Sequence, residues 1–271
     1  MQLFYRHIGQ GSPFIILHGL YGSSDNWVGF ARGLQNEFEF IIPDLRNHGQ
    51  SMHTAEFNYP VMCSDLSELM DSCKINKPIL MGHSMGGKLA MEYARQYSDR
   101  LSSLIVLDIA PLSYTERPRE SLLKHEQIIR AMLSVDLSQI DNRLEIEEEL
   151  GERLGNRALC RFLLKNLSKD KNGQFKWRLN LQSLAANCSR LSEGITDMNY
   201  CCHVPALFVK AKNSTYINEN DKAAIKLLYP ESDFLEIEAA SHCLHADQPL
   251  LLKAGICNFL KNNFNMNVHN I

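Results

Sequence analysis

One short segment, residues 82–87 with the sequence GHSMGG, most constrains what this chain can fold into. It follows the apolar run 78–81 and opens a stretch, 84–97, whose apolar residues recur at helical spacing. A Gly-x-Ser-x-Gly motif between a strand and a helix predicts a sharp turn, in which the glycines let the two elements approach closely. Ser84 would then be exposed at a helix N-terminus, where free N–H groups favour developing negative charge. Ser84 is therefore a candidate nucleophile.

Apolar, β-rich runs alternate with amphipathic segments along most of the chain. The expected strands are residues 2–8, 13–17, 38–43, 78–82, 103–108, 205–210 and 233–238. Helical patterns fall at residues 25–36, 59–74, 84–97, 218–229 and 248–263. Short apolar strands that alternate with helices predict an α/β fold with a mostly parallel sheet covered on both faces.

The alternation stops between residues 112 and 200, where no strand-like run is found. We expect helices there at 119–133, 142–154, 156–166 and 178–190. The sequence thus predicts a core in two parts, 1–111 and 201–271, with 112–200 inserted as a helical cap over one end of the sheet. The insertion is charged but nearly neutral, with 14 basic and 13 acidic residues.

Composition excludes several function classes. The 271 residues carry a net charge of −3, which gives no electrostatic case for nucleic-acid binding. No apolar run approaches the roughly 18 residues of a membrane helix, and the N-terminus does not resemble a signal peptide. Eight scattered cysteines without a Cys-x-x-Cys pair indicate reduced thiols that serve as small apolar residues in a cytoplasmic protein. We expect no metal site.

A serine hydroxyl is a weak nucleophile and needs a base, which in turn needs a group to orient it. His242 is the best candidate because it follows the expected strand 233–238, and strand ends gather the chemistry of an open α/β sheet. We expect His245 to be a helix-start or packing residue. Structural hydrogen bonds are expected of His18, His48 and His83. No constellation surrounds the remaining histidines, His7, His53, His125, His203 and His269.

An oxyanion hole requires two N–H donors. The first should be the N–H of Met85, directly after the serine. The second should come from the loop after an early core strand, and the Gly-rich segment 18–23 fits that position, with Leu20 as donor.

The sharp turn at Ser84, which we call the elbow, the loop 18–23 and His242 occur in an order that resembles the α/β-hydrolase superfamily. The resemblance covers roughly residues 10–110 and 203–262. Three motifs, HGLYGSSDNW, DLRNHGQS and LDIAP, more narrowly resemble the bacterial YbfF-type esterases and their mitochondrial relatives. The resemblance implies an α/β-hydrolase fold with a helical cap.

The third member of the triad is the point where this chain departs from the family. Members usually place an acid in the loop after the strand expected at 205–210, but this chain has Ser214 at that position. The YbfF-like resemblance implies Asp108 instead, at the end of the strand after the elbow helix. Glu219 and Asp221 remain alternative acids.

The resemblance and the residues favour a serine hydrolase, a carboxylesterase or thioesterase, with Ser84, His242 and Asp108 as the triad. Such chemistry needs no cofactor and acts on a small-molecule acyl ester or thioester. A carbon–carbon bond hydrolase of the same fold and a non-catalytic ligand-binding member remain alternatives.

Overall fold

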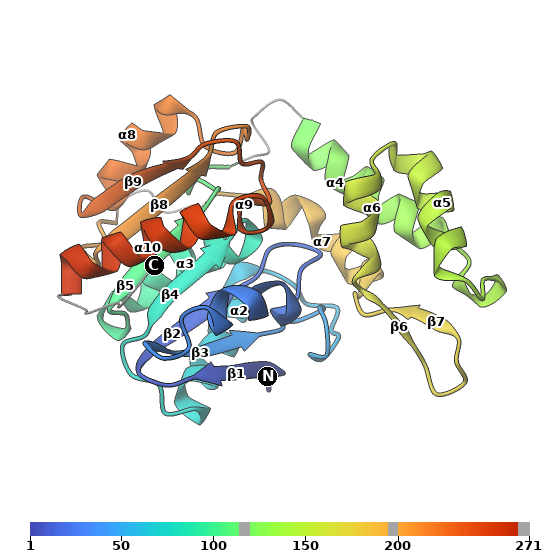
Figure 1. Cartoon of the computed structure of the whole chain (residues 1–271), viewed down its shortest axis with the longest axis horizontal. Helices are drawn as coiled ribbons and strands as arrows, with labels where there is room; N and C mark the ends of the chain where they lie inside the picture. Colours follow the sequence, from blue (N-terminus) through green and yellow to red (C-terminus); the bar gives the residue numbers. More distant parts are fainter. Residues whose placement is uncertain (114–119, 195–199, 265–271) are drawn as a thin grey trace.

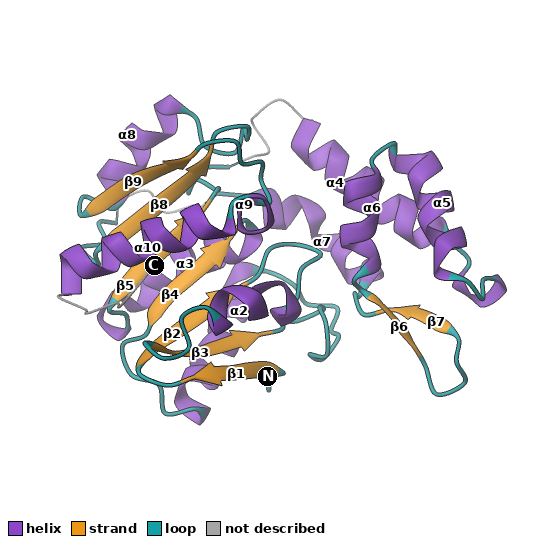
Figure 2. Ribbon diagram, in the orientation of Figure 1, coloured by secondary structure: helices purple, strands orange, loops and turns teal. Residues whose placement is uncertain are grey.

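A seven-stranded sheet forms the centre of the molecule, with the strand order β1-β3-β2-β4-β5-β8-β9 (Figures 1 and 2). The computed structural model describes residues 1–113, 120–194 and 200–264. β1 runs antiparallel to β3, and every other neighbouring pair in this sheet is parallel. The strands are β1 (Tyr5–Gly9), β2 (Ser12–Leu17), β3 (Phe38–Pro43), β4 (Ile79–His83), β5 (Ser103–Leu107), β8 (Ala206–Ala211) and β9 (Ser232–Ile237).

Each strand expected from the sequence is present, with its ends displaced by a few residues. The central strands β4 and β5 are buried at every position, because helices cover both faces of the sheet. The covering helices are α1 (Val28–Arg32), α2 (Tyr59–Ser72), α3 (Met85–Tyr97), α8 (Glu219–Leu228), α9 (Leu244–Asp247) and α10 (Pro249–Phe264). The helix expected at 25–36 is instead a 3-10 turn, η1 (Ser24–Trp27), followed by the short α1.

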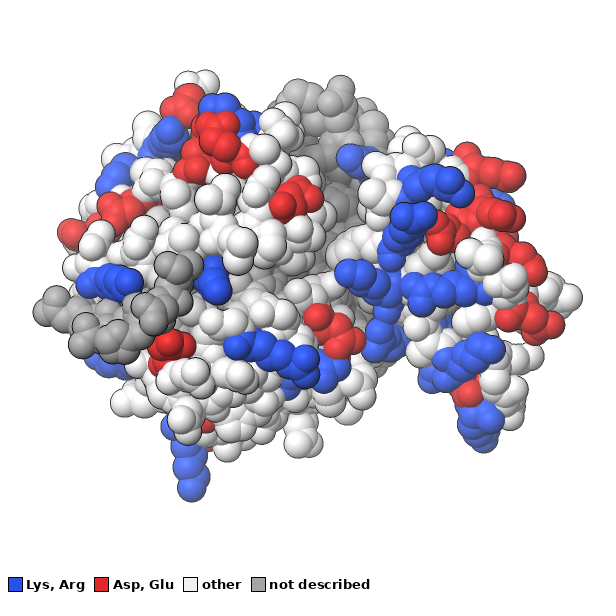
Figure 3. All heavy atoms as spheres, viewed as in Figure 1, with Lys and Arg blue, Asp and Glu red and all other residues white. Residues whose placement is uncertain are grey.

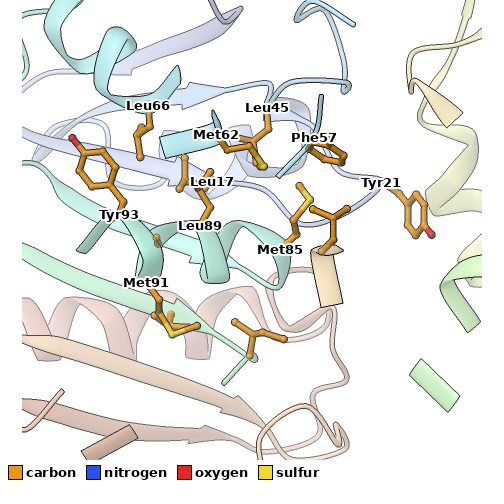
Figure 4. Close-up of a cluster of buried hydrophobic side chains, with 14 of the residues drawn as sticks. Leu17, Tyr21, Leu45, Phe57, Met62, Leu66, Met85, Leu89, Met91 and Tyr93 are labelled. Atoms are coloured by element: carbon orange, nitrogen blue, oxygen red, sulfur yellow. The ribbon is translucent and has the colours of Figure 1, made fainter. Parts of the chain in front are cut away.

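Two apolar clusters lie on opposite faces of the sheet. On one face, Leu17 of β2 packs with Met62 of α2 and Leu89 of α3, as Figure 4 shows. On the other face, Trp27 and Ile256 of α10 pack against the sheet. These clusters hold the ends of β4 and β5 in fixed positions relative to α3.

Between β5 and β8 the chain forms the helices expected there, at slightly different bounds. They are α4 (Glu120–Ser134), α5 (Arg143–Leu154), α6 (Arg157–Leu164) and α7 (Leu181–Ser192), with the 3-10 turn η3 (Leu137–Gln139) after α4. They lie beyond the carboxyl ends of the parallel strands (Figure 1). We call the segment 112–200 the cap.

The expectation that the cap contains no strands was wrong. β6 (Leu167–Lys169) and β7 (Phe175–Trp177) form an antiparallel hairpin. Its loop is closed by Asp170, which accepts hydrogen bonds from the N–H groups of Asn172 and Gln174 at 2.8 and 3.0 Å. Strands of three residues are too short to produce a recognisable alternation of apolar and polar residues.

The charges of the cap, nearly balanced in number, lie apart from each other on the face of the molecule that Figure 3 shows. Figure 3 shows Lys and Arg side chains along the side of the cap that faces the core, and Asp and Glu side chains along its outer side. The acidic residues concentrate in α5, whereas the segment 157–178 carries seven basic residues and one acidic residue.

The structure also tests the expectations about the cysteines and about membrane helices. All eight cysteines are free, as expected of reduced thiols, and Cys201 is exposed rather than packed as a small apolar residue. Within the described ranges, every helix falls short of the length and apolarity needed to cross a bilayer.

Candidate active site

Ser84 lies between β4 and α3 in a backbone conformation that residues other than glycine rarely adopt, with φ 51° and ψ −116°. The neighbouring glycines make this turn possible. A Cβ on Gly82 would lie 2.1 Å from the carbonyl oxygen of Gly86, and a Cβ on Gly86 would lie 2.3 Å from that of Leu17. The close packing of strand against helix therefore excludes any side chain at 82 or 86 and holds Ser84 in a strained turn.

His242 lies in the loop between β9 and α9, and both ring nitrogens have partners. Its Nε2 is 2.9 Å from the Ser84 Oγ, and its Nδ1 is 2.8 Å from Oδ2 of Asp108. Because a carboxylate only accepts hydrogen bonds, Nδ1 carries a proton and Nε2 is free to accept one from Ser84. Both distances fall within hydrogen-bond reach.

Asp108 follows β5 and is fully buried, at 0% exposure. Its Oδ1 accepts a hydrogen bond of 3.0 Å from the Ala211 N–H at the end of β8, so both carboxylate oxygens are engaged. The alternative acids lie elsewhere. Glu219 is exposed and pairs with Lys222, and Asp221 caps its own helix. Among the three candidate acids, the structure brings Asp108 to His242.

Two other histidines support the loop that carries His242. Nε2 of His83 is 2.8 Å from the His242 carbonyl oxygen, so its N–H donates to that oxygen and ties the elbow to the loop. Burial lowers the pKa of His83 well below its usual value. His245 stacks on Trp27 at 4.6 Å between ring centroids, and burial lowers its pKa to about 4. Both act as structural residues, as expected.

The loop after β2 approaches the elbow closely. The Gly22 N–H donates to the Gly19 carbonyl oxygen at 2.9 Å, and Tyr21 within this turn has φ 63°. A Cβ on Gly19 would lie 3.3 Å from the Ser84 Cβ. The neighbouring Leu20 therefore stands beside the candidate nucleophile.

A pocket opens at Ser84, and both the core and the cap contribute to its walls. Met85, the first residue of α3, lies in the wall, and its N–H belongs to the first turn, where N–H groups have no intrahelical partner. The lining residues are Leu20, Ser84, Met85, Lys88, Ile109, His125, Cys188, Leu191, Ser192 and Tyr216. The two expected oxyanion donors, Leu20 and Met85, thus share this pocket with Ser84.

Among the pocket residues that sequence reasoning missed, two are connected to His242. Tyr216, in the loop after β8, stacks on the His242 ring at 4.0 Å between centroids and 22° between planes. His125 of α4 was expected to have no constellation, which is wrong, because it contacts the Tyr216 hydroxyl and lines the pocket. No motif marks either residue, since the contacts join distant parts of the chain.

Lys88, a buried residue of α3, connects the elbow helix to the cap. Its Nζ donates to the Ser192 carbonyl oxygen at 2.9 Å, at the end of α7. Within the described ranges, no group of three or more His, Cys, Asp or Glu residues could hold a metal ion.

Comparison with known families adds independent information. The family model described as the alpha/beta hydrolase fold matches residues 12–249. The chain is 34% identical over 255 residues to sn-1-specific diacylglycerol lipase ABHD11 of Danio rerio, which covers 93% of this chain and 80% of that protein.

Two further proteins named as esterases match over most of their length. Esterase YbfF of Escherichia coli K12 is 33% identical over 240 residues, which is 88% of this chain and 89% of the relative. The solved structure of a marine microorganism esterase superposes with a TM-score of 0.93 at 39% identity, covering 96% of this chain and 100% of that one.

Proposed function

The chain belongs to the α/β-hydrolase family, and we propose that it is a serine esterase that cleaves carboxylic esters or thioesters through Ser84, His242 and Asp108. The observation that carries the proposal is the continuous hydrogen-bonded series from the Ser84 Oγ through both nitrogens of His242 to the buried Asp108 carboxylate. The esterase and lipase relatives support ester hydrolysis as the reaction class.

Acylation begins when the Ser84 Oγ attacks the ester carbonyl carbon and Nε2 of His242 accepts the hydroxyl proton. The carbonyl π electrons move to the oxygen, which becomes an oxyanion. Asp108 keeps the proton on Nδ1 and stabilises the imidazolium that forms. The bond to the leaving group then breaks, and Nε2 returns its proton to the departing alcohol or thiol.

We assign the oxyanion to the N–H groups of Leu20 and Met85. Two such donors stabilise charge that develops only as the carbonyl becomes tetrahedral, so they accelerate the reaction rather than bind the ground state. Water, deprotonated by His242, next attacks the acyl-enzyme by the same steps and releases the carboxylic acid. No metal or organic cofactor takes part in this mechanism.

We further propose that segment 112–200 functions as a cap that selects the substrate. Leu191 and Cys188 of α7 line the pocket together with Leu20, Met85 and Ile109, so half of the ten lining residues are apolar. An apolar lining combined with placed polar groups suits a small-molecule substrate with an apolar acyl group. The thiol pattern of the sequence favours a reducing compartment, and we propose the cytoplasm.

The test is hydrolysis of a chromogenic ester, p-nitrophenyl butyrate, by the wild type and by Ser84→Ala. We expect turnover to fall by ~10⁴-fold or more, because the remaining groups stabilise only the oxyanion and the bound substrate. A serine-reactive phosphonate should label the wild type and leave Ser84→Ala unlabelled. Ser64→Ala, at an exposed position of α2 outside the pocket lining, is the matched control and should retain both hydrolysis and labelling. Near wild-type hydrolysis by Ser84→Ala would refute the assignment.

A further inference from the structure

One residue of the cap contacts both sides of the cleft that contains Ser84. The Nδ1 of His125 is 3.3 Å from the hydroxyl of Tyr21, which belongs to the loop that carries the proposed oxyanion donor. The Nε2 of the same ring is 3.4 Å from the hydroxyl of Tyr216. Tyr216 in turn stacks on His242. His125 therefore bridges the oxyanion loop and the partner of the proposed base. Figure 4 shows Tyr21 directed toward the cap.

The protonation states of the three groups are compatible with this bridge. Burial lowers the pKa of His125 to about 4, so its imidazole is neutral at pH 7 and has one donor and one acceptor nitrogen. The Tyr21 hydroxyl donates its one proton to the His125 carbonyl oxygen at 3.3 Å, so Nδ1 carries the ring proton and donates to the Tyr21 oxygen, and Nε2 accepts from the Tyr216 hydroxyl. Burial raises the pKa of Tyr216 to about 12, so it remains a neutral phenol.

The stacked ring of Tyr216 restrains the plane of the His242 imidazole, which the hydrogen bond to Asp108 does not fix. A single hydrogen bond at Nδ1 fixes one edge of the imidazole, but it does not fix the plane of the ring. Tyr216 lies nearly parallel to that plane, at 22°, whereas the ring of His83 contacts His242 at 4.8 Å and 41°. An aromatic face also attracts the imidazolium that forms when Ser84 loses its proton.

We propose that Tyr216 and His125 are positioning residues of the esterase: Tyr216 holds the His242 ring against Ser84, and His125 lets the cap set the position of Tyr216. That Tyr216 positions the His242 ring rests on the stacking geometry. That this positioning affects catalysis rests on the proposed function. Both contacts of His125 are long for hydrogen bonds, so the stacked ring carries most of the effect and the bridge from α4 adjusts it.

Kinetics of three variants test the proposal. In Tyr216→Leu, which removes the stacked ring, we expect kcat for p-nitrophenyl butyrate to fall by roughly 3- to 30-fold with little change in KM, the range of a cation–π contact. Tyr216→Phe keeps the ring and should retain most of the wild-type kcat. His125→Leu removes the contacts with Tyr21 and Tyr216, and its kcat should lie between those of Tyr216→Leu and Tyr216→Phe. Leu191→Ala, another change in the pocket wall, should instead raise KM.

A second readout needs no turnover. The Nδ1 proton of His242, held by Asp108, should give a downfield proton NMR signal in the wild type. We expect the signal to broaden by exchange in Tyr216→Leu and to persist in Tyr216→Phe.

The outcomes separate this inference from the proposed function. An unchanged kcat and an unchanged signal in folded Tyr216→Leu would overturn it, as would a change in KM alone, because Tyr216 would then be only a wall. If Tyr216→Leu does not fold, His125→Leu tests the same bridge. Broadening in a protein that hydrolyses no ester would support the positioning role and reject the esterase.

Discussion

Replacing Asp108 by asparagine removes a charge at nearly constant shape, and the surrounding bonds determine how the new amide must sit. Oδ1 of Asp108 accepts from the Ala211 N–H at 3.0 Å, and Oδ2 faces Nδ1 of His242 at 2.8 Å. The amide has only one acceptor atom. If its NH2 group faced Ala211, two buried donors would oppose each other at a cost of about 1–3 kcal/mol.

The amide oxygen should therefore face Ala211, which directs the NH2 group at Nδ1 of His242. Nδ1 must then be unprotonated, and the proton moves to Nε2. In that tautomer, Nε2 donates toward the Ser84 Oγ, 2.9 Å away, and cannot accept its proton. We expect turnover to fall by about 10⁴-fold, equivalent to about 5 kcal/mol in the activation barrier.

The assay is kcat for p-nitrophenyl butyrate, with a urea unfolding curve to show that the variant is folded. Glu219→Gln is the matched control, since the same chemical change occurs on an exposed carboxylate. Asp221→Asn should also be nearly silent in turnover. Less than a tenfold loss in folded Asp108→Asn, or a large loss in Glu219→Gln, would refute the reasoning.

Two further predictions concern stability. Gly82→Ala should prevent folding or cost several kcal/mol, because the new Cβ would lie 2.1 Å from the Gly86 carbonyl oxygen, whereas Gly29→Ala, with open space around its Cβ, should be tolerated; equal unfolding midpoints would contradict this. The pKa of His245 is lowered to about 4 in the folded chain, so below pH ~6.5 the unfolded chain binds a proton at this residue and the folded chain does not. The free energy of unfolding therefore keeps its full value above that pH and decreases toward pH 4. His245→Phe should keep the stacking on Trp27 and reduce the loss of unfolding free energy between pH 7 and 5 by about 1–2 kcal/mol, and an unchanged loss in urea titrations would count against it.

Much of the core was predictable because its signals are local. The elbow at Ser84 depends on residues adjacent in sequence, and the fully buried β4 and β5 appear as short apolar runs. The distance between Asp108 and His242 could be anticipated because parallel strands end at the same edge of a sheet. The loop from 210 to 217 contains no carboxylate, so an acid for His242 had to come from another segment.

The remaining features depend on contacts between segments far apart in the chain. Tyr216 and His125 are separated by 91 positions, and nothing near either residue indicates that their side chains meet. The β6–β7 hairpin escaped notice because its strands have three residues each. The prediction of one helix at 25–36 was wrong, because the segment forms a 3-10 turn followed by the short α1 (Val28–Arg32).

The strand order has a consequence for how the protein becomes active during its synthesis. β8 and β9 add in chain order to the edge of the sheet formed by β5, and His242 follows β9, 134 positions after Asp108. A nascent chain therefore carries the proposed nucleophile, acid and oxyanion loop before the cap has been translated. It lacks the proposed base until the last strand docks. Ester hydrolysis should thus begin only when the sheet is complete, and the onset of turnover in a translation reaction would time the final folding step.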